Sequence, residues 1–277
     1  MEGIRTRVKI GRVFLYIFSY SFVLVWLIPM LWMVITAIKP DGSPVTVLSE
    51  LIKPPFTMDN YQYVSENASI WRWTWNSVYI AVVTTALTLL LTSMAAFALS
   101  RIPFKGSKLV FWIIIAGLMV PTEATIIPLF MMMVDSGLIN SYSSIIFPSI
   151  AAPLGVLILK QFYDAIPKEL VEAAEMDGAN KLRIWWSIFL PLSRSSMAAL
   201  GIFTFISSWN NFLWPFLAIS DEKMMTLPIG IPLFQSGYAA ELTIPMAANM
   251  LASLPALLVF ILFQKHIIKG ITMTGIK

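Results

Sequence analysis

The sequence contains no cysteine and only one histidine, His266, among its 277 residues. Disulfides and thiolate metal sites are therefore excluded, and one histidine cannot form a histidine-based metal or catalytic cluster. The Gly-Lys dipeptide that a P-loop requires is also missing. We expect no cofactor or metal to be bound by this chain, and no ATP hydrolysis by that route.

Charge is also scarce. Only 12% of the residues are charged and 58% are hydrophobic, with a mean hydropathy of +0.78. An ordinary soluble domain has about 25% charged residues, which it needs to cover its surface. This composition fits a bilayer as the solvent. The net charge of +4 does not indicate a nucleic-acid partner, because the basic residues lie between the apolar segments.

Six segments are apolar and long enough, or nearly so, to cross about 30 Å of hydrocarbon as helices. The first exceeds the roughly 7–15 residues of a signal-peptide core, so we expect a retained span. The fourth is short and interrupted by Pro148 and Pro153. None alternates as a barrel strand does, so the sequence predicts an all-α polytopic membrane protein with six transmembrane helices. The segments are residues 13–38, 76–100, 109–134, 143–159, 195–219 and 243–264.

Lysine and arginine are distributed unevenly between the two sides of these spans. Residues 1–12, 101–108, 160–194 and 265–277 hold 15 of the 19 basic residues, and the opposite side holds four. By the positive-inside rule, both termini and the 160–194 loop are predicted to be cytoplasmic.

The predicted external loop, residues 39–75, combines proline and glycine turns with three tryptophans. Trp71, Trp73 and Trp75 suit a belt at the membrane–water interface just before the second span. A docking surface for a partner is the alternative interpretation of this loop.

The cytoplasmic loop contains a short helix pattern. Pro167 fits a first helical position, Glu169 lies in the first turn, and Gly178 fits the left-handed stop position. The sequence therefore predicts a helix over residues 167–177, a rod of roughly 16 Å. A second helical stretch is expected from Asn180 to Pro191.

One face of the short helix is shallow. Leu170, Ala173, Ala174 and Asp177 share it by their i, i+3, i+4 spacing. Two alanines allow another protein surface to approach closely, so the pattern favours a docking element. An ordinary surface helix packed on its own bundle fits these features equally well.

The same loop resembles the EAA loop of binding-protein-dependent ABC importer permeases at full spacing. The matching residues are Glu172-Ala173-Ala174, Gly178, Ile188 and Leu190-Pro191. Three stretches have sequences that resemble the carbohydrate branch of these permeases, of the maltose kind: residues 171–178, residues 208–215 and Asp59-Asn60-Tyr61. The resemblance runs nearly end to end and implies the type I importer permease fold.

The resemblance implies a set of roles and partners. Residues 167–178 would form a coupling helix that docks in a cleft of an ATPase subunit, with Glu172 meeting a basic residue and Gly178 allowing the close turn. The partners would be a second homologous permease, two ATPase subunits that bind ATP and Mg²⁺, and an extracytoplasmic binding protein. The coupling residues would be Leu170, Glu172, Ala173, Ala174, Asp177 and Gly178.

The resemblance also implies location, cargo and domain limits. The chain would be a non-enzymatic permease of a bacterial cytoplasmic membrane that imports a sugar or oligosaccharide, with a glycerol phosphate compound as the alternative cargo. Residues 72–265 would be the shared core. Residues 1–71 would hold the N-terminal tail, first span and external loop, and residues 266–277 a cytoplasmic tail.

Two sets of residues are candidates for the substrate pathway. Glu123 lies within the third span beside Pro121, where a carboxylate is costly and a helix can open. A partner-paired or protonated structural glutamate is the alternative. In the fifth span, tryptophan suits stacking on a sugar and asparagine suits its hydroxyls, although polar packing between helices explains these residues as well. The fifth-span candidates are Ser208, Trp209, Asn210 and Asn211, with Thr204 and Ser207 nearby.

Two other functional classes remain. An ion-coupled secondary transporter with Glu123 as the coupling carboxylate would show inverted repeats, and none is evident. A non-transporting assembly or sensor subunit would form its complex without moving a substrate.

Overall fold

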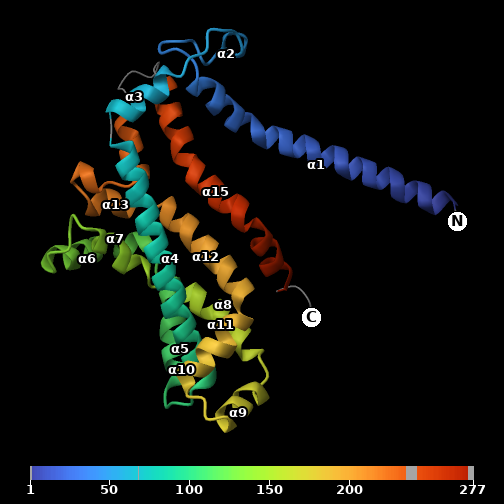
Figure 1. The fold of residues 1–277 in the computed structure, drawn as a ribbon, viewed down its shortest axis with the longest axis vertical. Coiled ribbons are helices and arrows are strands. Elements are labelled where there is room, and N and C mark those ends of the chain that lie inside the picture. Colours follow the sequence, from blue (N-terminus) through green and yellow to red (C-terminus); the bar gives the residue numbers. More distant parts are fainter. Residues whose placement is uncertain (1, 68, 235–241, 274–277) are drawn as a thin grey trace. The chain divides into compact units, whose positions relative to one another are not determined.

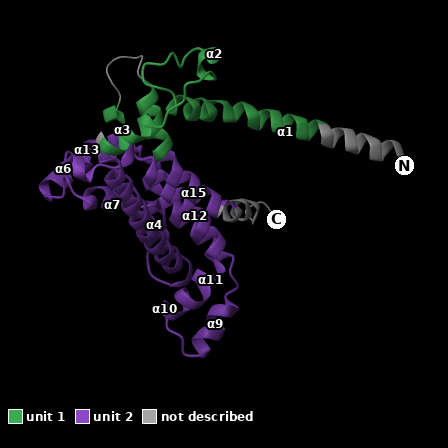
Figure 2. Ribbon diagram, turned by 45° about the horizontal axis from the view of Figure 1, so that its top comes forward, with its two compact units in different colours: residues 1–68, 231–251 green, residues 69–230, 252–277 purple. Residues whose placement is uncertain are grey.

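The computed structural model of the chain describes residues 2–67, 69–234 and 242–273, with side chains for residues 14–66, 69–234, 242–262 and 264. All regular structure in these ranges is helical (Figure 1). The chain divides into two compact units, residues 1–68 with 231–251 and residues 69–230 with 252–277 (Figure 2).

The helices confirm the polytopic membrane architecture. Three segments are long and apolar enough to cross a membrane alone: Phe14–Ala37, Ile70–Arg101 and Thr243–Leu262. Three bent helix pairs pass the same test, which gives up to six spans if each pair is one span.

The first unit contains α1 (Glu2–Ala37), α2 (Leu48–Leu51), α3 (Asp59–Asn67) and the beginning of α15 (Thr243–Met273). Every described side chain of α1 from Phe14 to Leu31 is exposed. A helix that is apolar all round needs lipid or another protein against it.

The loop after α1 is held by buried polar contacts. Asn60 Nδ2 donates to the carbonyl oxygens of Ala37 at 2.9 Å and Lys39 at 2.6 Å, which caps the end of α1. The buried Lys39 ammonium donates to the Lys53 carbonyl and lies 4.7 Å from the Phe56 ring centroid. The predicted irregular loop therefore contains two short helices and a fixed turn.

The second unit is built around α4 (Ile70–Arg101), which packs against α8 (Pro153–Asp164) and α12 (Arg194–Trp209) (Figure 1). Small side chains let these backbones approach. A Cβ placed on Gly155 of α8 would lie 2.9 Å from Thr92 Cγ2 and 3.1 Å from Leu200 Cδ2. Close contact at small residues is the usual basis of helix packing in lipid.

The third predicted span is not one straight helix. It consists of α5 (Ser107–Ala116), η1 (Gly117–Met119) and α6 (Thr122–Asp135), and the two halves are bent by 103°. Pro121 has no N–H for the helix ladder and holds Val120 in an extended conformation, which separates the halves. The helix thus opens at Pro121, as the sequence predicted, and the two halves of the predicted span over residues 109–134 run in different directions.

The fourth span breaks where its prolines predict. It consists of α7 (Tyr142–Ser149) and α8, bent by 44° with Pro153 at the start of α8. The helix continues five residues beyond the predicted end at 159, to Asp164.

The fifth predicted span, residues 195–219, is also interrupted. The helix α12 ends at Trp209, and α13 (Leu213–Ala218) follows after a break. The preceding stretch is α10 (Lys181–Ile184), the π-helix η2 (Trp185–Phe189) and α11 (Leu190–Leu192), bent by 80° from α12. Asn180 caps α10 by accepting the Arg183 N–H at 2.8 Å, as the predicted second helical stretch requires.

The sixth helix is longer than expected, because α15 continues to Met273. Residues 274–277 of the predicted tail, and the side chain of His266, lie outside the described residues.

Two of the three tryptophans of the predicted belt are exposed and the third is buried. Trp71 and Trp75 are 64% and 68% exposed, one helical turn apart on α4. Trp73 points the other way: it is 1% exposed, and its Nε1 donates to the Glu222 carbonyl at 2.8 Å. The alternation follows from helix geometry, since residues i and i+4 share a face and i+2 does not.

Candidate functional site

The predicted cytoplasmic helix is α9 (Glu169–Met176). It begins where the Lys168 carbonyl accepts the N–H groups of Val171 at 2.9 Å and Glu172 at 3.0 Å. The expected start at Pro167 is two residues too early. The Ile166 carbonyl, which would begin such a helix, accepts a hydrogen bond from the Arg101 side chain instead.

The end of α9 agrees with the prediction. Gly178 has a φ of +78°, in the left-handed region. Its N–H donates to the Glu175 carbonyl at 3.0 Å, and the Ala179 N–H donates to the Ala174 carbonyl at 2.9 Å. This is the glycine-terminated helix end in which the carbonyls of Ala174 and Glu175, in the last turn, find partners.

Little of α9 is packed against its own chain. Val171 is 8% exposed and belongs to a buried cluster with Tyr163 and Ile184, and Ala174 is half-buried against that cluster. Met176 is 89% exposed. The predicted shallow face is therefore split, because its other three members, Leu170, Ala173 and Asp177, are exposed.

The exposed surface of α9 is acidic. Glu169, Glu172 and Asp177 are exposed, and none of them forms an ion pair within the part of the chain that the structure describes. Glu175 differs, because it pairs with Lys181. The surface therefore carries unpaired carboxylates beside apolar side chains, a combination that suits contact with basic groups.

A groove of about 630 Å³ lies between α4, α8 and α12 in the second unit. Polar side chains reach it from α12 and the residues just after its end, at helical spacing: Ser196, Thr204, Ser207, Ser208 and Asn211. Phe203 gives the same wall an apolar ring, and Thr84 contributes from α4. The hydroxyl of Thr84 has no hydrogen-bond partner among the described residues.

The structure brings two of the five pathway candidates into this groove, Ser208 and Asn211. Trp209 is buried and stacks on Phe205 with ring centroids 5.9 Å apart, and Asn210 is exposed at the end of α12. Glu123 is exposed in the first turn of α6, where the helix N-terminus favours its charge.

Polar contacts near the beginning of α4 were not predicted from the sequence. Asn76 is buried; its Nδ2 donates to the carbonyls of Lys223 at 3.0 Å and Met225 at 2.8 Å, and its Oδ1 accepts the Tyr142 hydroxyl at 2.8 Å. The helix pattern alone gives Asn76 no partner, since these residues lie far away in the sequence. No group of three or more acidic or histidine side chains suited to a metal occurs among the described residues.

Comparison with known proteins places this geometry in a family. A family model described as "Binding-protein-dependent transport system inner membrane component" matches residues 88–273. The chain is 36% identical over 252 residues to the arabinooligosaccharides transport system permease protein AraQ of Halalkalibacterium halodurans, covering 90% of each chain.

It is also 32% identical to the trehalose/maltose transport system permease protein MalG of Thermococcus litoralis, covering 96% of this chain and 97% of that one. In fold it is similar to a chain of a bacterial ABC transporter involved in the import of the acidic polysaccharide alginate. The TM-score is 0.82 at 21% identity, over 93% of this chain and 96% of the other.

Proposed function

The chain belongs to the family of binding-protein-dependent transport system inner membrane components, and on that premise we propose that it is the permease subunit of an ATP-driven importer of a sugar or oligosaccharide. The observation that carries the proposal is α9, an exposed helix with the EAA sequence that is anchored to its own chain mainly by Val171. Such a helix has its remaining surface free for a partner.

The cargo is proposed from the relatives and from the groove. The AraQ and MalG relatives are permeases for arabinooligosaccharides and for trehalose or maltose. The groove combines hydroxyl and amide groups with the ring of Phe203, which suits a molecule with many hydroxyls and apolar ring faces. Its lining contains no lysine or arginine, which disfavours the anionic glycerol phosphate alternative.

Within this proposal α9 is the coupling helix. Glu172 meets a basic residue of the ATPase, and Leu170, Ala173, Ala174 and Asp177 line the contact around it. Gly178 takes the left-handed conformation of the turn that ends α9, and because it has no side chain the ATPase surface can approach the turn closely. ATP-driven closure of the ATPases then moves α9 and the helices attached to it.

The complete importer contains this chain, a second homologous permease, two ATPase subunits that bind ATP and Mg²⁺, and a binding protein on the outer side. Both termini and α9 face the cytoplasm, because 15 of the 19 lysines and arginines lie in the segments of that side. The chain itself binds no cofactor, and the division into residues 1–71, 72–265 and 266–277 stays a prediction.

The test is ATP-dependent uptake of a labelled oligosaccharide by the reconstituted importer with Glu172→Ala. We expect uptake to fall at least about tenfold, since loss of one charge-assisted contact at an interface is worth roughly 1.5–3 kcal/mol, while the amount of permease in the membrane stays normal. Glu66→Ala, which removes an exposed glutamate of α3, is the matched control. Equal uptake by both variants would contradict the assignment of α9.

A further inference from the structure

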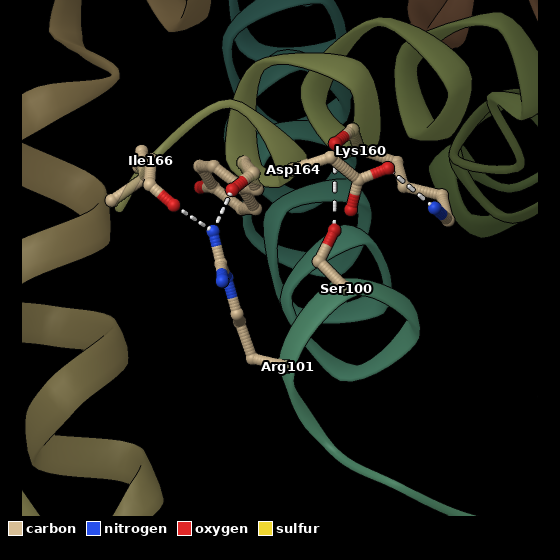
Figure 3. A network of polar contacts seen from close by, with 6 residues as sticks. Ser100, Arg101, Lys160, Asp164 and Ile166 are labelled. Atoms are coloured by element: carbon tan, nitrogen blue, oxygen red, sulfur yellow. Dashed lines mark hydrogen bonds and ion pairs between the residues drawn. The ribbon is translucent and has the colours of Figure 1, made fainter. Parts of the chain in front are cut away.

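One arginine connects the elements that surround α9. Arg101 is the last residue of α4, and its Nη2 donates hydrogen bonds to the main-chain carbonyl oxygens of Tyr163 and Ile166. Figure 3 shows the guanidinium group pointing into the end of α8 and the turn that follows it. The last carbonyls of a helix lack partners within the helix and carry partial negative charge, so a guanidinium is a suitable partner there.

The same guanidinium lies near an aromatic ring in the part of the chain that follows α9. Its Cζ is 5.4 Å from the ring centroid of Phe189 in η2, within the range of a cation–π contact. Phe189 is fully buried, and its ring packs edge-on against Tyr163 and Phe97 at centroid distances of 5.0 and 4.9 Å. Arg101 thus contacts the chain on both sides of α9 in the sequence: Tyr163 and Ile166 before the helix, and Phe189 after it.

Neighbouring contacts reinforce the α4–α8 side of this junction. The Ser100 hydroxyl donates to the Lys160 carbonyl at 3.4 Å, and the Lys160 ammonium pairs with Asp164 at 2.6 Å (Figure 3). These contacts stay within α4 and α8. Among the described residues, only Arg101 donates a hydrogen bond to the carbonyl of Ile166, three residues before α9 begins.

We propose that Arg101 is a positioning residue that makes α9 move together with α4 and α8. The proposal rests on α9 being the coupling helix. Val171 and the half-buried Ala174 are a narrow anchor for an eight-residue helix. Arg101 fixes the chain on both sides of α9 to the end of α4. Because α4 and α8 form walls of the groove, a displacement of α9 then reaches the groove.

Arginine is specifically suited to this position. A planar guanidinium can donate to two carbonyls at its edge while its face lies against Phe189, whereas an ammonium group lacks the planar face. We therefore expect Arg101→Lys to retain part of the coupling between ATP hydrolysis and uptake, and Arg101→Met to lose most of it.

The experiment compares Arg101→Met, Arg101→Lys and Lys108→Met in the assembled importer. Lys108 is an exposed lysine of the same cytoplasmic side that has no side-chain hydrogen bond or ion pair among the described residues, so it controls for loss of charge. Two quantities are measured in proteoliposomes: ATP hydrolysis stimulated by the loaded binding protein, and sugar taken up per ATP hydrolysed.

For Arg101→Met we expect normal assembly and a fall of about tenfold in sugar per ATP, the scale of an ordinary coupling free energy. Arg101→Lys should be intermediate and Lys108→Met normal. An unchanged ratio in Arg101→Met would overturn the proposal. Loss of the assembled complex in both Arg101 variants would also overturn it, because that result assigns Arg101 to folding.

A second measurement needs no partner and separates this proposal from the proposed function. The chain has no cysteine, so spin labels on Lys105→Cys and Met176→Cys, both exposed sites, report one distance between the end of α4 and α9. We expect a narrow distribution in the parent and a broad one in Arg101→Met. If no ATPase binds the parent chain, the proposed function fails. If the distribution stays narrow in Arg101→Met, the positioning role fails.

Discussion

Replacing Gly178 separates two roles that one glycine can have, ending α9 and leaving room for a partner. Its φ of +78° costs a residue with a side chain about 1–2 kcal/mol, with asparagine among the residues that tolerate it best. A Cβ at this position would meet nothing within 4 Å in the isolated chain. The substitution Gly178→Asn should therefore keep the turn and add only bulk toward the partner.

The matched control is Gly137, which ends α6 in the same way. Its φ is +65°, its N–H donates to the Val134 carbonyl at 2.9 Å, and the Leu138 N–H donates to the Met133 carbonyl at 2.9 Å. Here too a Cβ would meet nothing within 4 Å. We therefore expect an asparagine to have a similar conformational cost at the two positions.

The assay is thermal unfolding of the purified permease together with the amount of ATPase retained on it. Both asparagine variants should unfold within a few degrees of the parent, since a cost of about 1 kcal/mol shifts the midpoint of a chain of this size by roughly 2–4 °C or less. Only Gly178→Asn should lose the ATPase, about tenfold or more. Full retention by Gly178→Asn would refute the reasoning that a close approach requires this glycine.

Three further predictions concern the other elements. Asn76→Ala should lower the free energy of unfolding by about 1–3 kcal/mol, because the carbonyls of Lys223 and Met225 and the Tyr142 hydroxyl lose their buried partner; an unchanged unfolding midpoint in detergent would contradict this. Asn211→Ala should raise the KM for sugar uptake by about fivefold or more at unchanged ATPase binding, since Asn211 lines the groove; an unchanged KM would remove this residue from the pathway. Glu123→Gln should leave uptake insensitive to a protonophore, as in the parent; uptake that collapses with the proton gradient in the parent and not in the variant would favour an ion-coupled transporter.

The presence of up to six apolar helical spans was predictable, because the bilayer requires apolar helices and their composition is visible in the sequence. The bends within the spans were harder to predict. The break at Pro153 was expected, but Pro121 was interpreted as a local opening, and the structure shows a 103° bend there. A proline marks where a helix can break, and packing against neighbouring helices decides how far.

The site was predictable where its signal is local. The left-handed turn at Gly178 and the start of a second helical stretch near Asn180 depend on residues within a few positions, and the structure confirms both. The role of Arg101 was not visible, because its acceptors lie 62 and 65 residues away. In the sequence it is one more positive charge beside a span.

Affinity purification of the tagged chain from its native membranes, the parent beside Gly178→Asp, followed by mass spectrometry, identifies the proteins that accompany each chain. Our account predicts an ATPase and a second permease with the parent chain, and much less ATPase with Gly178→Asp. Recovery of the parent chain alone, or only as a homo-oligomer, would contradict an ATP-driven importer.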